Sequence, residues 1–416
     1  MYISFSNTPA TGDGTRGGSG ARVSATVVVL GVVSLLTDVS SESTAAVLPL
    51  YVTSVLGLGT IAFGFLDGLY QGVSALVRIM GGWAADRIDQ PKWIAFIGYG
   101  CSALARIALV FATGFGALLA VITADRIGKG IRTGPRDALI SAASDPADLG
   151  RAFGVHRMLD TVGAAAGPLI AFVILFLIPD GFSTVFVVSL AFAVMGVVLL
   201  GLAVPNLRPR ADRAARVHAP RTPFRWRSLL APELRRLLVV TGVLGLLTIG
   251  DGFLYLLLQA RDGFAAEFFP LLYVGTNVVF LALAVPIGRL ADRFGRTRVF
   301  VLGYVALLAA YLAAAAPSFG LASTLLCLIL LGVFYASTDG ILAAIAAMVT
   351  PPEARATGIA AAQTVVALAR LIASTGFGVL WYLLGPTTAV LVMACGLAVA
   401  IPVIAVLLRR KAGTTS

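Results

Sequence analysis

Four long apolar stretches of the chain each contain at least one carboxylate, and these side chains have the clearest capacity for chemistry. Asp38 and Glu42 share the first stretch, and Asp125, Asp251 and Asp339 each lie in a later one. Asp38 and Glu42 are spaced i,i+4, so that on a helix they lie on one face. Two carboxylates this close compete for ionisation, and such a pair can take up and release a proton.

Basic side chains occur in similar apolar surroundings. Arg126 and Lys129 are one helical turn apart, and Arg370 lies in a later apolar stretch. Arg126 and Lys129 could hold an anionic group or the ionised Asp38–Glu42 pair, and we expect Arg126 to be the main partner of that pair. The alternative is that these contacts only lock neighbouring helices together.

The elements that must position these residues are membrane-spanning helices. Of the 416 residues, 58% are hydrophobic and only 12% are charged, whereas soluble domains carry about 25% charged residues. This composition excludes an ordinary soluble enzyme and a disordered protein. A spanning helix needs roughly 20 apolar residues. The apolar runs predict twelve spans, at about 25–51, 60–83, 93–113, 117–140, 152–178, 183–204, 237–258, 267–289, 297–316, 321–348, 357–382 and 387–408.

The net charge of +11 is unevenly distributed over the loops between these spans. One set of loops is rich in arginine and lysine, including nine arginines between residues 208 and 236, whereas the opposite set holds only Arg261. Basic residues favour cytoplasmic loops. We therefore expect both termini to be cytoplasmic, in the inner membrane of a bacterial cell, and we expect no nucleic-acid partner.

The chain also contains an internal repeat. Gly82–Arg87 after the second span resembles Gly288–Arg296 after the eighth, and Arg151–Gly154 resembles Arg355–Gly358. Two similar six-helix halves are typical of transporters. The predicted organisation is a disordered tail, two helix bundles joined by a basic linker, and a second tail, at 1–23, 24–204, 205–236, 237–408 and 409–416.

These motifs resemble the major facilitator superfamily over essentially the whole chain. Gly288–Arg298 is similar to the signature that follows the second or eighth span of that family, although Asp89 and Gln90 depart from it in the first copy. Leu36–Glu42 and Arg126–Ile140 resemble a bacterial subgroup of mostly unassigned substrate. The resemblance implies an all-α membrane fold of twelve helices in two pseudo-symmetric six-helix bundles.

The resemblance also implies that spans one, four, seven and ten line a central cavity. Each of these spans carries an acid, which favours a role in binding substrate or protons. The candidate cavity residues are Asp38, Glu42, Asp125, Arg126, Lys129, Asp251, Asp339 and Arg370.

In the fifth span, Gly163, Gly167 and Pro168 resemble the glycine–proline signature of drug/proton antiporters. Small residues of this kind also allow two helices to pack closely, so that packing alone is an alternative explanation. His156, at one end of the same span, could relay protons, although a solvated or paired interfacial histidine is the simpler interpretation.

A second set of charged residues lies at the helix ends of the repeated signature. By resemblance, these residues brace the two halves when the cytoplasmic side of the cavity is closed. The candidate gate residues are Asp86, Arg87, Asp292, Arg293 and Arg296.

The sequence thus predicts a secondary transporter that uses alternating access, with no cofactor and no resident metal. We expect proton-coupled efflux of a small organic molecule, with proton-coupled uptake of a small metabolite or metal-chelate complex as the alternative. We expect a monomer whose partners are substrate, protons and lipid. A membrane-embedded enzyme or a non-transporting sensor is a remote alternative, because the only histidines are His156 and His218 and they suggest no catalytic cluster.

Overall fold

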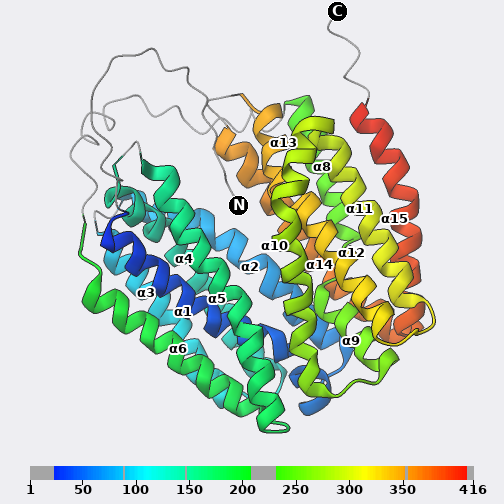
Figure 1. The fold of residues 1–416 in the computed structure, drawn as a ribbon, viewed down its shortest axis with the longest axis horizontal. Coiled ribbons are helices and arrows are strands. Elements are labelled where there is room, and N and C mark those ends of the chain that lie inside the picture. The colour runs from blue at the N-terminus through cyan, green and yellow to red at the C-terminus, as the bar shows by residue number, and fades with distance from the viewer. Residues whose placement is uncertain (1–22, 88–89, 146–147, 208–230, 352–354, 410–416) are drawn as a thin grey trace, which may run out of the picture.

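The computed structural model describes residues 23–87, 90–145, 148–207, 231–351 and 355–409. Nearly all of these residues are helical, and no β-strand occurs among them (Figure 1). The first half contains α1 (Ala25–Leu50), η1 (Tyr51–Val55), α2 (Thr60–Arg87), α3 (Pro91–Val110), α4 (Phe115–Ala142), α5 (Leu149–Leu177) and α6 (Phe182–Ala203). The second half contains α8 (Pro232–Leu246), α9 (Asp251–Asp262), η4 (Ala266–Phe268), α10 (Phe269–Phe294), α11 (Arg296–Ala315), α12 (Leu321–Thr338), α13 (Ile341–Val349), α14 (Arg355–Leu384) and α15 (Pro386–Arg409).

The predicted all-α membrane fold is confirmed. Ten helical segments of the described chain are long and apolar enough to cross a membrane. The 28-residue helices α2 and α4 are as long as the others but more polar. In α4 this is because six charged residues, from Asp125 to Asp137, interrupt the apolar sequence. Most of the linker predicted at 205–236 lies outside the described residues, although α8 already begins at Pro232.

The helices form two bundles that lie side by side, with α1–α6 in one and α8–α15 in the other (Figure 1). The first residues of α1 and the last residues of α15 lie at the same end of the molecule. We call this end the terminus side and the opposite end the far side. Under the arginine distribution described above, the terminus side is the predicted cytoplasmic side.

Two of the predicted spans are broken near their middle, which the sequence interpretation did not anticipate. The span predicted at 237–258 consists of α8 and α9, with residues 247–250 between them. The hydroxyl of Tyr311 compensates for this break, because it accepts a hydrogen bond from the Ile249 amide at 2.7 Å and donates one to the Leu247 carbonyl at 3.1 Å. Backbone groups freed inside a membrane need such partners.

The span predicted at 321–348 is divided into α12 and α13 at Asp339 and Gly340. Gly340 has a φ of +73°, a left-handed conformation that glycine adopts without steric cost. Both breaks therefore place an aspartate at a helix end, Asp251 at the start of α9 and Asp339 at the end of α12. Broken helices at mid-membrane commonly form the binding sites of transporters.

The two halves pack against each other on the far side. The rings of Phe63 in α2 and Phe253 in α9 are 4.7 Å apart in an edge-to-face arrangement. At the start of α2, the Thr60 hydroxyl donates to the Gly378 carbonyl of α14 at 3.1 Å. Gly252 packs so closely against Phe63 that a Cβ atom there would collide with the ring, and the same atom would lie only 3.0 Å from Pro49 Cγ. These contacts seal the far side, so the space between the halves faces the terminus side.

Candidate functional site

A cavity of about 500 Å³ lies between the two halves, on the terminus side of these sealing contacts. Its wall comes from both bundles and combines charged and hydroxyl-bearing side chains with apolar ones. The charged and hydroxyl-bearing lining residues are Glu42, Asp67, Tyr70, Arg126, Lys129, Asp251, Tyr255, Tyr273, Thr276, Tyr335, Asp339 and Arg370. Six of the eight predicted cavity residues are in this wall. The remaining two, Asp38 and Asp125, are buried beside it.

In the first bundle, Lys129 bridges the two carboxylates of α1. Its Nζ lies 3.7 Å from Asp38 Oδ1 and 3.8 Å from Glu42 Oε1. Asp38 also faces Arg132 at 3.7 Å. The spacing argument correctly places both acids on one face of α1. However, Lys129 rather than Arg126 is the cation that pairs with them, because the guanidinium of Arg126 turns toward another acid.

That acid is Asp125, which is buried behind the cavity wall. Its Oδ2 accepts hydrogen bonds from Arg106 at 3.1 Å and from Arg126 Nε at 3.0 Å. The guanidinium of Arg126 also stacks on the ring of Tyr70, 3.7 Å from its centroid. Neighbouring residues on one helix can therefore pair directly, although side chains at i and i+1 start about 100° apart. Asp125 holds two arginines in place and has no exposed face toward the cavity.

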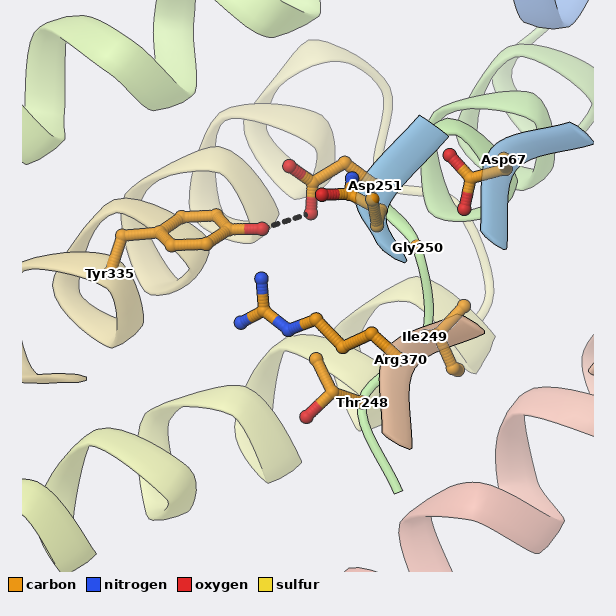
Figure 2. Close-up of a pocket in the computed structure, with 8 residues that line it drawn as sticks. Asp67, Thr248, Ile249, Gly250, Asp251, Tyr335 and Arg370 are labelled. Carbon is orange, nitrogen blue, oxygen red and sulfur yellow. Dashed lines mark hydrogen bonds between the residues drawn. The ribbon is translucent and has the colours of Figure 1, made fainter. Parts of the chain in front are cut away.

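In the second bundle, the charged residues gather at the two helix breaks. Figure 2 shows Arg370 of α14 beside Asp251 and Tyr335. The Tyr335 hydroxyl donates to Asp251 Oδ1 at 2.7 Å. The buried Nε of Arg370 has no hydrogen-bond partner among the described residues. Asp339, at the other break, is exposed in the cavity wall.

Several lining residues were missed by the sequence interpretation. Asp67 of α2 is the most important of them, because it is a further acid in an apolar span. It was not predicted because the family resemblance implies that spans one, four, seven and ten line the cavity, whereas Asp67 lies in the second span. Tyr70 and Tyr255 were also missed, and tyrosines carry no positional signal in an apolar sequence. An Asp-Gly pair lies in mid-span at both breaks, at Asp251–Gly252 and Asp339–Gly340, but Asp67–Gly68 lies within the continuous helix α2, so the pair alone does not predict a break.

The candidate gate residues of the second bundle lie on the terminus side. Asp292 Oδ1 accepts hydrogen bonds from Arg296 Nε at 3.0 Å and Nη2 at 2.8 Å, which ties the end of α10 to the start of α11. Arg293 is exposed beside Phe294. The side chains of Asp86 and Arg87 lie outside the described part of the chain. The described contacts of Asp292 are thus within one bundle, in a conformation whose terminus side is open.

The fifth-span motif has a packing role in the structure. A Cβ atom at Gly163 would collide with the backbone of Leu35, and one at Gly167 would lie 2.7 Å from the Ser43 amide nitrogen. Pro168 is buried inside the same helix. The glycines thus let α5 pack directly on α1. On the same helix, His156 is buried without a hydrogen-bond partner among the described residues, so it is not the solvated or paired interfacial histidine expected from the sequence.

The comparison with known protein families agrees with this architecture. A family model described as Major Facilitator Superfamily matches residues 30–276 and 260–416. The chain belongs to the major facilitator superfamily. It is 28% identical over 374 residues to an uncharacterized MFS-type transporter of Methanocaldococcus jannaschii, a match that covers 86% of this chain and 89% of that protein.

Solved structures show the same fold at low sequence identity. The nucleoside transporter NupG superposes with a TM-score of 0.76 and 16% identity, over 93% of this chain and 100% of that one. A POT family transporter in complex with 5-aminolevulinic acid gives a TM-score of 0.75 at 14% identity, over 92% of this chain and 96% of that one. As a member of this superfamily, the chain is a secondary transporter that works by alternating access in a membrane.

Proposed function

We propose that this transporter exchanges protons for a small polar organic molecule that carries charged groups. The observation that carries the proposal is the cavity of about 500 Å³ and its charged wall. Its volume lies within the 300–1,000 Å³ that is usual for pockets that bind small molecules. The substrate and the protons would both be bound in this cavity, between the two bundles.

The charged groups of the wall argue for a substrate that carries charged groups of its own. An apolar molecule would separate the charged groups of the wall from water without offering them partners, which is costly. A molecule with its own charged and hydrogen-bonding groups would satisfy them. The related folds include a nucleoside transporter and a transporter in complex with 5-aminolevulinic acid, and we expect a substrate of comparable polarity here.

The charge balance of the wall supports coupling to protons. Four carboxylates line the cavity (Glu42, Asp67, Asp251 and Asp339), against three cations (Arg126, Lys129 and Arg370). Lys129 is also shared with Asp38. An uncompensated carboxylate at membrane depth is costly. A bound proton or a cationic group of the substrate would remove the excess charge, so the two would compete for the same acids.

Competition of this kind produces exchange, and the direction we propose is efflux of substrate driven by proton entry. Because Gly163 and Gly167 serve helix packing, the fifth-span motif alone does not distinguish export from uptake. Uptake of a small metabolite or metal-chelate complex remains the alternative, and it would require proton and substrate to bind together.

Proteoliposomes that enclose a pH-sensitive dye can distinguish proton exchange from proton co-transport. A thermal-shift screen with nucleosides, 5-aminolevulinic acid and dipeptides would first identify a ligand, because a ligand of the folded state raises its apparent stability. Exchange predicts that this ligand accumulates in vesicles that are acidic inside, whereas co-transport predicts accumulation when the outside is acidic. Ligand counterflow without any proton movement in either gradient would contradict proton coupling.

A further inference from the structure

Asp67 joins the two halves of the molecule at the floor of the cavity. Its Oδ2 accepts a hydrogen bond from the hydroxyl of Ser374 at 2.7 Å, between residues that are 307 positions apart in the sequence. Asp67 belongs to α2 in the first bundle and Ser374 to α14 in the second. The contact lies on the cavity side of the Phe63–Phe253 ring pair, in the wall that closes the far side.

The break between α8 and α9 makes room for the Asp67 carboxylate. A Cβ atom on Gly250 would overlap Asp67 Oδ2, so a side chain at position 250 would force Asp67 out of this position. The Asp67 carboxylate thus lies against the backbone at the break, next to Asp251, the first residue of α9. An acid of one bundle is in this way inserted into the broken helix of the other.

A second, much smaller cavity adjoins this contact (Figure 2). Its volume of about 10 Å³ is close to the smallest space that can hold one water molecule. Asp67, Asp251, Tyr335 and Arg370 are its titratable lining residues. Together they present two carboxylates and one guanidinium from α2, α9 and α14.

The titratable residues that line the small cavity include two carboxylates, Asp67 and Asp251, but only one cation, Arg370. The Tyr335 hydroxyl is committed to Asp251, and no described ion pair within 4.0 Å connects Arg370 to either acid. Asp67 and Asp251 are half-buried and also line the large cavity, so with the halves closed only the water of that cavity can solvate the surplus negative charge. The charge can be removed by a proton on Asp67, or relieved by separating the halves so that Asp67 is more fully hydrated.

We propose that Asp67 is a proton-binding site whose occupancy controls the far-side wall of the cavity. Protonated Asp67 stays between Ser374 and Gly250 and keeps the wall closed. Ionised Asp67 favours separation of α2 from α9 and α14, which opens the cavity to the far side. The inference rests on the proposed coupling to protons and adds to the Asp38–Glu42 pair a second proton site, which controls the far-side wall.

The far-side opening can be measured directly by distances between spin labels, without any substrate. Phe111 and Phe319 are exposed in far-side loops of the two bundles, at 77% and 79% of their surface. Labels at these positions, in a protein whose Cys101, Cys327 and Cys395 are replaced by serine, would report the separation of the halves. We expect the longer distance to gain population as the pH rises, by up to about tenfold per pH unit for one linked proton.

Asp67→Asn should hold the closed distance at every pH, because asparagine keeps the shape of the side chain and cannot ionise. Ser374→Ala is the matched variant, since it removes the hydrogen bond but leaves the titrating group. The distance between the labels in Ser374→Ala should still depend on pH, but the midpoint of that dependence should lie at a different pH. Asp251→Asn tests the neighbouring acid, and its response should also persist.

The proposal would be overturned if Asp67→Asn responded to pH like the parent protein, or if the parent showed no response. Loss of the response in Asp251→Asn with retention in Asp67→Asn would assign the proton to Asp251 instead. These outcomes are separate from the transport assay. Wild-type vesicles that couple protons to substrate, together with an unaltered Asp67→Asn response, would refute only the assignment to Asp67.

Discussion

Lys129 Nζ lies between Asp38 Oδ1 and Glu42 Oε1, at 3.7 and 3.8 Å, so that one ammonium group is shared by two carboxylates of the neighbouring helix. Its side chain is 31% exposed, whereas that of Asp38 is 11% exposed. The shared cation thus lies at the boundary between the cavity and the interior of the first bundle. A proton or a substrate cation that reaches Glu42 would release Lys129 to Asp38.

We expect Lys129→Gln to damage transport more than it damages folding. The substitution leaves Asp38 with Arg132 but removes the cation that Glu42 shares. A loss of about tenfold or more in exchange rate is expected, since 1.4 kcal/mol of lost interaction corresponds to a factor of ten. The measurement is ligand counterflow in proteoliposomes at matched protein content. Lys92→Gln is a control outside the cavity, because Lys92 donates to the Gly201 carbonyl, and its counterflow should stay near that of the parent.

The roles of Asp38 and Glu42 can be tested apart from that of Lys129 by replacing each carboxylate with a neutral amide of the same shape. We expect Asp38→Asn and Glu42→Gln each to abolish accumulation driven by a pH gradient while sparing gradient-independent counterflow. The reason is that both carboxylates share the one ammonium group of Lys129, so that a neutral side chain at either position changes the charge balance of the whole cluster. Proton flux on addition of ligand is the measurement. If both variants still moved protons with ligand at the parent rate, the pair would be structural, and coupling would belong to Asp67 or Asp251.

The sequence predicted the helices well because apolar run length is a strong signal in membrane proteins. For example, α6 was expected at 183–204 and occupies Phe182–Ala203. The breaks at 247–250 and at Asp339–Gly340 were not predicted. An apolar run of sufficient length predicts a membrane span whether or not the helix within it is continuous. An Asp-Gly pair lies at each break, but Asp67–Gly68 lies in the unbroken helix α2, so this local pattern does not distinguish a broken span from a continuous one.

The partners of the site residues were harder to predict than their positions. The i,i+4 spacing correctly grouped Asp38 and Glu42, because that geometry lies within one helix. The choice of Lys129 over Arg126 depends on how α4 is rotated against α1, and no local pattern encodes this. The same limit applies to Asp67, whose importance arises only when α2 meets the break before α9.

Asp125 holds the first bundle together by neutralising two buried arginines. Its side chain is 6% exposed, and those of Arg106 and Arg126 are 5% and 3% exposed. Asp125→Asn would leave two guanidinium groups facing a neutral amide, and removal of one partner of a buried ion pair costs about 3–5 kcal/mol. We expect a large fall in apparent melting temperature. Asp137→Asn is the control, because Asp137 is 43% exposed in its pair with Arg136 and pairs of that kind contribute little. Equal melting temperatures in the two variants would contradict this account.

The orientation of the molecule can be tested in the basic linker. Residue Arg216 lies outside the described residues, but its loop is part of the arginine-rich set. In a protein without the three native cysteines, Arg216→Cys should react with an impermeant thiol reagent only after the cells are opened. Phe319→Cys, on the far side, is the matched variant and should react in intact cells. The reverse pattern would place the termini outside, so that the terminus side, where the cavity is open, would be the outer side of the membrane.

Asp292 and Arg296 form an exposed pair, with 64% and 36% of their side chains exposed. In the present conformation they tie α10 to α11, and Arg296 also contacts Met348 of α13 in the same bundle, which agrees with a brace that engages the first bundle when the terminus side closes. We expect Asp292→Asn to shift the population toward the terminus-side-open state and to slow turnover, with little loss of folded protein. Spin labels at Ser141 and Val406, near the terminus-side ends of α4 and α15, would show a larger share of the long distance.

Arg157→Gln is a suitable control for this prediction, since it breaks an ion pair with Asp160 inside the first bundle. An unchanged distance distribution in Asp292→Asn would show that this pair only caps the helices it connects, because a brace between the halves must alter their separation when its charge is removed.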